Sequence, residues 1–262
     1  MAVASRRHLR ARGVALRHAQ FRSTSIPSAT LGPIWQYWAQ GVDKAPPIVK
    51  ACLRSVERHR GNRELVVLDD STLERYLDLP GHVWDKRGTM GVVHFSDFIR
   101  LSLLLHHGGT WLDATILLRE PMPAEVEKED FYLLRQTGRP RLLEPWFIHA
   151  HQGHPLIETV LVDMSDYWAH HDRLAHYFLI CYLFEAALLL HGDLRRQFLA
   201  MPQVNVKVAH ALRISLLEPF EEAWHGTVYA RSWLHKLSHK YARPDDAQNL
   251  LCDRIIDGWP ER

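Results

Sequence analysis

Short apolar runs alternate with helical patterns in the first third of the chain, and this alternation limits the fold more than any other feature. Residues 34–38 are rich in residues that favour strands, and residues 46–59 open with two prolines and continue with apolar residues at helical spacing. A second apolar run at 64–68 precedes a helical stretch at 71–77. Strand, helix, strand and helix in this order predict an α/β domain built on a mostly parallel sheet.

The rest of the chain predicts two further strands and then helices. The strands are expected at 130–134 and 144–150, and the helices at 155–168, 177–190 and 193–201. Glycine and proline mark the breaks between these segments. We therefore expect a central sheet flanked by helices, with a helical C-terminal part.

Length and charge favour one large domain. A chain of 262 residues that is 47% hydrophobic can bury a full core, and we assign residues 26–262 to a single domain. Residues 1–25 carry six arginines and no acidic residue, which predicts a basic, disordered arm. A solvated tail, a peripheral membrane contact and a transit peptide are all open for this arm. The net charge of +2 gives no indication of nucleic-acid binding.

Cysteine usage and hydropathy indicate the compartment. The three cysteines are far apart and odd in number, so neither a disulfide framework nor a cysteine-based zinc site is expected, and a cytoplasmic location is the default. The most apolar run, residues 177–190, is shorter than a membrane-spanning helix and contains Glu185. We expect it to be a buried helix.

Candidate chemistry is concentrated between Ser96 and Thr115. Ser96 is suited to cap a helix that ends at Gly108, and Asp97 and Arg100 share one face of that helix because they lie three residues apart. A surface ion pair is the alternative for Asp97 and Arg100. Asp113 has the stronger indication, because a carboxylate at the end of a buried strand needs a cation, a metal or a hydrogen-bonding ligand beside it.

Other candidates lie at expected strand ends and near the C-terminus. The carboxyl ends of parallel strands are where ligands bind in α/β sheets, and four polar residues are expected there: Gln36, Asp69, Asp70 and Asp113. The basic segment 233–241 is either a solvated turn or a clamp for a diphosphate, with Lys236 and Lys240 as the cations and His235 as a hydrogen-bond donor or metal ligand.

A histidine-rich run at 149–154 suggests a metal-dependent hydrolase as a minor alternative. Its spacing matches no zinc motif that places two ligands one helical turn apart. The sequence also lacks a Gly-x-Ser-x-Gly elbow, a Walker phosphate loop and a Gly-x-Gly-x-x-Gly turn, which weakens esterase, nucleotidase and dehydrogenase interpretations.

Several segments together resemble a known family. They are residues 34–46, 67–70, 94–100, 108–115, 146–148, 177–179 and 235–240. The chain resembles the bacterial capsular polysaccharide synthesis protein family, which is similar to glycosyltransferase family 32 and its sugar transferases that carry an Asp-x-Asp motif. The resemblance covers most of the chain and is most specific at Ser-Asp-x-x-Arg, Gly-Gly and the strand that ends in Asp113.

The resemblance implies a GT-A-like, Rossmann-type transferase that uses a nucleotide-diphosphate sugar. Asp97, Arg100 and Asp113 would form the catalytic site. Binding of the donor and its nucleotide would then involve Trp35, Gln36, Asp69, Asp70, Thr115, Lys236 and Lys240. A core position is the alternative for Trp35.

A divalent metal, Mn²⁺ or Mg²⁺, is the cofactor that such relatives imply, with Asp113 and His235 as candidate ligands. Thr115 stands where related transferases carry the second aspartate of Asp-x-Asp, and a hydroxyl is a poor substitute for a carboxylate toward these ions. The sequence therefore leaves metal dependence open.

The expected function is transfer of a hexose, with retention at the anomeric carbon, to a glycan or lipid-linked acceptor in capsular polysaccharide biosynthesis. The enzyme would be cytoplasmic, with or without contact to the inner face of the membrane. A sugar-binding or polysaccharide-assembly protein without catalytic activity is the alternative on the same scaffold.

Overall fold

The computed structural model describes residues 31–135 and 143–260. Its centre is a five-stranded sheet in the order β2-β1-β3-β6-β5. The strands are β1 (Ile34–Tyr37), β2 (Leu65–Leu68), β3 (Gly109–Leu112), β5 (Phe131–Arg135) and β6 (Leu143–Ala150). β1 runs parallel to β2 and β3, whereas β6 runs antiparallel to both β3 and β5. Four strands therefore point one way and β6 the other, which confirms the expected α/β class with a mostly parallel sheet. The basic arm, residues 1–25, lies outside the described residues.

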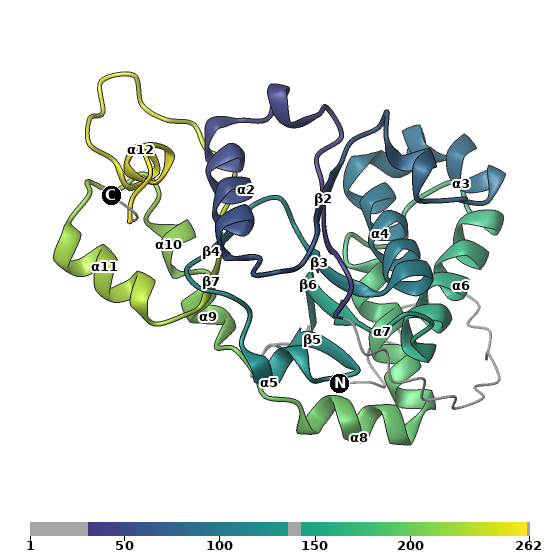
Figure 1. Ribbon diagram of the computed structural model, residues 1–262. Coiled ribbons are helices and arrows are strands. Elements are labelled where there is room, and N and C mark those ends of the chain that lie inside the picture. Colours follow the sequence, from purple (N-terminus) through teal and green to yellow (C-terminus); the bar gives the residue numbers. More distant parts are fainter. Residues whose placement is uncertain (1–30, 136–142, 261–262) are drawn as a thin grey trace.

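Helices cover both faces of this sheet (Figure 1). One side carries α3 (Gly81–Asp85), α4 (Arg87–His107), α6 (Pro155–His170) and α7 (Leu179–Leu190), and α8 (Gly192–Ala200) follows below them. The other side carries α2 (Pro47–His59), α10 (Ala211–Ile214), α11 (Glu222–Ala230) and α12 (Leu251–Ile256). Short helices α5 (Ala124–Glu127) and α9 (Val206–Ala209) complete the connections. The expected helical C-terminal part is thus present.

Each side of the sheet has its own apolar core. The larger core joins the sheet to α4, α6 and α7, with Phe98, Phe147 and Trp168 among its fully buried side chains. The smaller core packs α2 against α12 and against a second, two-stranded sheet formed by β4 (Ile116–Leu118) and β7 (Leu234–Lys236). This second sheet brings the C-terminal segment back to the end of β3.

The turn between α4 and β3 needs both of its glycines. Gly108 ends α4 with a φ of 65° and Gly109 begins β3 with a φ of 100°. A Cβ at Gly109 would lie 2.2 Å from the Pro33 carbonyl oxygen, so no other residue fits between β3 and the start of β1. The expected helix stop at Gly108 is confirmed.

Two local expectations need correction. Ser96 does not cap a helix, because α4 already begins at Arg87 and bends at Gly91, where φ is 73°. The Ser96 hydroxyl instead donates to the Val93 carbonyl inside α4. Residues 71–77 contain only the short 3-10 helix η2 (Leu73–Arg75), because Asp69 and Thr72 hold this segment in a side-chain-bonded turn.

Candidate active site

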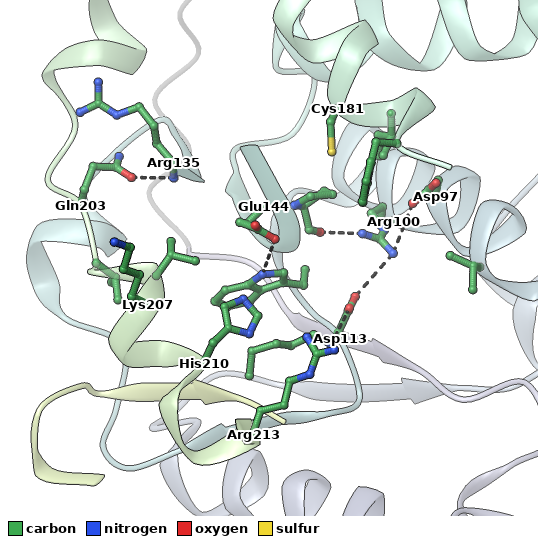
Figure 2. Close-up of a pocket in the computed structure, with 18 of the residues that line it drawn as sticks. Asp97, Arg100, Asp113, Arg135, Glu144, Cys181, Gln203, Lys207, His210 and Arg213 are labelled. Carbon is green, nitrogen blue, oxygen red and sulfur yellow. Dashed lines mark hydrogen bonds and ion pairs between the residues drawn. The ribbon is translucent and has the colours of Figure 1, made fainter. Parts of the chain in front are cut away.

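A cavity of about 1170 Å³ opens at the carboxyl end of β3. It lies between α4, β6, the start of α7, and α9 with α10 (Figure 2). Its charged lining residues are Asp97, Arg100, Asp113, Arg135, Glu144, Lys207, Arg213 and Lys236. Five of these side chains are cationic and three are carboxylates. The excess of positive charge favours an anionic ligand, and the volume exceeds the roughly 300–1,000 Å³ typical of a small-molecule site.

Asp97 and Arg100 meet in the wall of this cavity and not on the surface. Both residues are only 5% exposed, and Arg100 Nη2 lies 3.3 Å from Asp97 Oδ1. His94 Nδ1 lies 3.4 Å from the other carboxylate oxygen of Asp97. Buried charges are costly unless they are paired, so the surface ion pair considered as an alternative does not describe this arrangement.

The Arg100 guanidinium is held by several groups at once. Nη1 donates to the Pro145 carbonyl at 2.6 Å, and Nη2 donates to the Ser96 hydroxyl at 3.1 Å. The guanidinium also lies over the Trp111 ring at 5.1 Å, and Nη2 is 3.5 Å from Asp113 Oδ1. Figure 2 shows Arg100 between Asp97 and Asp113. This planar fork is fixed in place before any ligand arrives.

Asp113 follows directly after β3 and is surrounded by donors. Its Oδ1 accepts from the Trp111 indole N–H at 2.9 Å, and its Oδ2 accepts from Lys236 Nζ at 2.9 Å. Burial opposes ionisation of this carboxyl, but the charges of Lys236 and Arg100 outweigh burial and lower its pKa. Asp113 is therefore an anion at neutral pH.

Lys236 is brought to this site by the pairing of β7 with β4. Lys236 pairs with Ile116, and the Leu237 N–H donates to the Thr115 carbonyl at 2.9 Å. The Lys236 ammonium donates to the Thr115 hydroxyl as well as to Asp113. Thr115 itself is 7% exposed. The strand pairing thus unites Asp113, Thr115 and Lys236, which sequence analysis had assigned to one site from separate segments.

These residues are poorly suited to a divalent metal. The atoms that face the place between Asp113 and Thr115 are one carboxylate, one hydroxyl and an ammonium, and Mn²⁺ or Mg²⁺ prefers several oxygen ligands and no neighbouring cation. Among the described residues, no group of three His, Cys, Asp or Glu side chains is arranged to hold a metal.

His235, the other candidate ligand, does not lie beside Asp113. Neighbouring residues of a strand point to opposite faces, so His235 points away from Lys236 and into the interior. It is fully buried, bonded through Nε2 to the Tyr229 carbonyl and stacked on the Tyr229 ring. Burial lowers the pKa of His235 to about 4, so its imidazole is neutral.

The predicted nucleotide-binding residues of β1 do not line the cavity. Trp35 is 1% exposed, donates to the Gly108 carbonyl at 2.8 Å and packs edge-on against Tyr76. The core position considered as its alternative is the one the structure gives it. Gln36 is fully buried, and neither the nitrogen nor the oxygen of its amide has a hydrogen-bond partner among the described residues.

Asp69, Asp70 and Lys240 also lie away from the cavity. Asp69 accepts from Ser71 and Thr72 in a turn after β2, and these bonds lower its pKa. Asp70 accepts from the Tyr37 hydroxyl and pairs with Arg87. Lys240 is exposed. Their roles in donor binding remain predictions without geometric support.

Two of the three histidines in the run at 149–154 are structural, and no metal-holding group of three side chains is found among the described residues, so the hydrolase alternative is not supported. His149 Nδ1 lies 2.8 Å from the Thr110 hydroxyl, and His154 accepts from the Leu156 N–H at the start of α6. Burial lowers the pKa of His149 to about 4 and that of His154 to about 3. Both imidazoles are neutral parts of the core.

Sequence analysis missed part of the cavity wall. Glu144 is 5% exposed and accepts from the Trp146 indole N–H at 3.0 Å, and Trp146 packs edge-on against His210. The sequence did contain a signal for Glu144, because a carboxylate within an apolar strand needs a partner, as Asp113 does. Arg135, Lys207 and Arg213 approach from other segments (Figure 2). Nothing in their local sequence separates them from solvated cations.

The charged cavity opens at the carboxyl end of β3, which is the place where ligands bind in open α/β sheets. The family model described as "Capsular polysaccharide synthesis protein" matches residues 6–255. The chain belongs to this family.

Two individual proteins are also similar to the chain. An O-glycosyltransferase, PaGT, of Phomopsis amygdali is 33% identical in an alignment of 96 residues, which covers 32% of this chain and 24% of that protein. The chain thus matches about a quarter of the length of this curated relative. The solved structure of PaToxG Glycosyltransferase is 12% identical, with a TM-score of 0.43 over 65% of this chain and 76% of that one.

No helix in residues 31–135 or 143–260 has the length and apolar character needed to cross a membrane. Within the run at 177–190, Leu179–Leu190 form α7, whose residues Leu183 and Phe184 are fully buried in the larger core. The expectation of a buried helix is confirmed. The three cysteines are free and buried.

Proposed function

We propose that this protein is a GT-A-like glycosyltransferase that moves a sugar from a nucleotide-diphosphate donor to a glycan or lipid-linked acceptor in capsular polysaccharide synthesis. The observation that carries the proposal is the cluster of Arg100, Asp113 and Lys236, which lies in a large cavity of a chain that belongs to this family.

The cluster supplies what sugar transfer requires. The bond between the anomeric carbon and the diphosphate oxygen breaks, and its electron pair stays on the diphosphate. The acceptor hydroxyl oxygen forms the new bond to the anomeric carbon, and its proton passes ultimately to solvent. Negative charge grows on the leaving diphosphate, so fixed cations stabilise the transition state more than the ground state.

The roles divide between the two sides of Asp113. Lys236 offers a compact positive charge to the diphosphate, and the Arg100 fork together with Asp97 and Asp113 orients sugar hydroxyls. Another part of the same cavity is lined by Glu144, Arg135 and Lys207 (Figure 2). This part has room for the acceptor.

Slow hydrolysis of the donor tests the proposal. Purified protein is incubated without acceptor with a panel of UDP-, GDP-, ADP- and dTDP-sugars, and release of nucleoside diphosphate is measured. We expect release from one donor class, because a transferase lets water replace the acceptor at a low rate. Binding of a donor without any release would favour the sugar-binding alternative.

Finer features of the reaction stay predictions of the family resemblance. Retention at the anomeric carbon is checked by NMR of the product, and transfer of a hexose by the identity of the donor that is consumed. The cytoplasmic location and a membrane contact of the basic arm are likewise predictions. Binding of the intact chain to anionic vesicles, compared with a chain that lacks residues 1–25, tests the contact.

A further inference from the structure

The ammonium of Lys236 lies between the two residues that correspond to the metal-binding motif of related transferases. Its Nζ is 2.9 Å from Asp113 Oδ2 and also donates to the Thr115 hydroxyl. The Lys236 side chain is 16% exposed and lines the cavity. An ammonium group is therefore held at the place between Asp113 and Thr115.

This charge is tied to the fold. Lys236 belongs to β7, which pairs with β4, and β4 begins directly after Thr115. Backbone hydrogen bonding from Leu237 to Thr115 fixes the register of the two segments. The lysine cannot leave this position through a simple loop movement, because its neighbours Leu234 and Leu237 are buried in the two cores.

The ammonium keeps bonding capacity for a ligand. An ammonium group has three N–H donors, and two of them are directed to Asp113 and Thr115. Among the described residues these are the two hydrogen-bond partners of the Lys236 ammonium, and Lys236 lines the cavity, so its third donor is left for an anion there. A diphosphate oxygen suits this donor, because charge-assisted hydrogen bonds of this type are strong.

We infer that Lys236 takes the place of the divalent metal, so that the donor diphosphate is bound and its leaving charge is stabilised without Mn²⁺ or Mg²⁺. This inference rests on the proposed function. A metal ion between Asp113 and Thr115 would lie close to the positive charge of Lys236 and would have Asp113 as its one carboxylate ligand. Both features oppose metal binding. Lys236 is thus a catalytic residue.

Equilibrium binding of nucleoside diphosphates tests the inference. ADP, GDP, UDP and dTDP are titrated into the wild-type protein by calorimetry, once in EDTA and once in MnCl₂. We expect one of them to bind with the same affinity in both solutions. Binding that disappears in EDTA and returns with Mn²⁺ overturns the inference. Failure of all four to bind contradicts the proposed function itself.

Variants separate a phosphate contact from a structural role. Lys236→Met should weaken the diphosphate about ten- to a hundredfold and leave the affinity for the corresponding nucleoside unchanged. Lys128→Met, an exposed lysine outside the cavity, is the matched control and should change neither affinity. Equal weakening of diphosphate and nucleoside by Lys236→Met overturns the inference. Lys236→Gln serves in the same way if the methionine variant does not fold.

Binding of Mn²⁺ alone gives a readout that needs no nucleotide. Electron paramagnetic resonance follows the free ion during titration of the wild-type protein and of the double variant Thr115→Asp, Lys236→Ala. In the double variant, Lys236→Ala removes the ammonium and Thr115→Asp adds a second carboxylate beside Asp113. We therefore expect the double variant to bind Mn²⁺ more tightly than the wild type. Equal binding by both proteins overturns the inference.

Discussion

The two ends of β3 both carry polar side chains, and the cavity of about 1170 Å³ opens at the carboxyl end. At the amino end, Thr110 accepts from Arg63 Nη2 at 2.8 Å and lies 2.8 Å from His149 Nδ1. At the carboxyl end, Asp113 accepts from Lys236 and lies beside Arg100 in the cavity wall.

The difference between these ends lies in what their polar groups contact. Arg63 also donates to the Gly32 and Pro33 carbonyls, each at 3.0 Å, so its guanidinium ties the chain before β1 to β3. The Lys236 ammonium instead bonds to Asp113 and Thr115 and lines the cavity. A buried polar cluster therefore indicates function only where part of its bonding capacity faces a space that a ligand can enter.

The largest expected effect is that of Asp113→Asn on sugar transfer. The substitution keeps the size of the side chain but removes the charge that holds Lys236 and Arg100 in place, so we expect transfer to fall about a thousandfold. Rates of donor turnover measure this effect. Asp130→Asn, an exposed aspartate outside the cavity, is the control and should keep the wild-type rate. Near-normal turnover by Asp113→Asn would show that Asp113 is not a catalytic residue.

At the amino end of β3, Arg63→Met should lower stability and leave catalytic turnover unchanged. The substitution removes the bonds to the buried Thr110 hydroxyl and to the partly buried Gly32 and Pro33 carbonyls, which should lower the free energy of unfolding by about 2–4 kcal/mol. Turnover per folded molecule should not change. Urea denaturation measures the first quantity, and rates corrected for the folded fraction measure the second. A specific loss of donor affinity would show that the amino end also takes part in function.

Arg100→Lys should lower transfer about ten- to a hundredfold and leave the fold intact. A lysine keeps the charge but cannot reach the Pro145 carbonyl, the Ser96 hydroxyl and Asp113 at the same time. The comparison is made in kcat and KM for the donor. If the lysine variant retains full activity, the geometry of the guanidinium is not what the site uses.

A further expected effect is a pH dependence of stability that comes from His149. Its pKa is lowered to about 4 by burial and by the charge of Arg63, whereas an unfolded chain has an imidazole pKa of about 6.5. Between these values the unfolded chain binds a proton that the folded protein excludes. The stability from neutral His149 is therefore complete above about pH 6.5 and falls as the pH drops toward 4, by on the order of 2–3 kcal/mol.

His149→Asn isolates this contribution from those of the other histidines. The variant should be less stable at pH 7 but should lose less of its remaining stability on acidification than the wild type does. Urea denaturation at pH 7 and pH 5 gives the two differences. Identical losses in both proteins would mean that His149 does not titrate in this range.

The local sequence predicted the helices and strands better than it predicted the tertiary contacts between them. The strands and long helices follow from apolar spacing, and the Gly108-Gly109 turn follows from its glycines. Asp113 could be singled out because a carboxylate ended a buried strand. Its direct contact with Lys236, 123 residues later, depends on the pairing of β4 with β7, which no local pattern encodes.

The residues that were wrongly predicted to face the site were mispredicted for the same reason, namely that tertiary contacts set the direction of a side chain. Trp35 and Asp69 lie near the ends of neighbouring strands, as expected, but the direction of each side chain is set by packing. Trp35 points into the larger core, and Asp69 bonds to its own turn. His149 attracted attention as part of a metal-like run, yet it bonds to Thr110 of the neighbouring strand. Tertiary contacts decided which polar residues face the cavity.

The most direct measurement is the position of a bound nucleoside diphosphate in a crystal of this protein. We expect the two phosphate groups in the cavity at the carboxyl end of β3, with an oxygen within hydrogen-bond distance of Lys236 Nζ and with Arg100 and Asp113 on the same side. Phosphate density elsewhere, beside Asp69 and Asp70 or on the outer surface, would contradict the assignment of this cavity as the donor site.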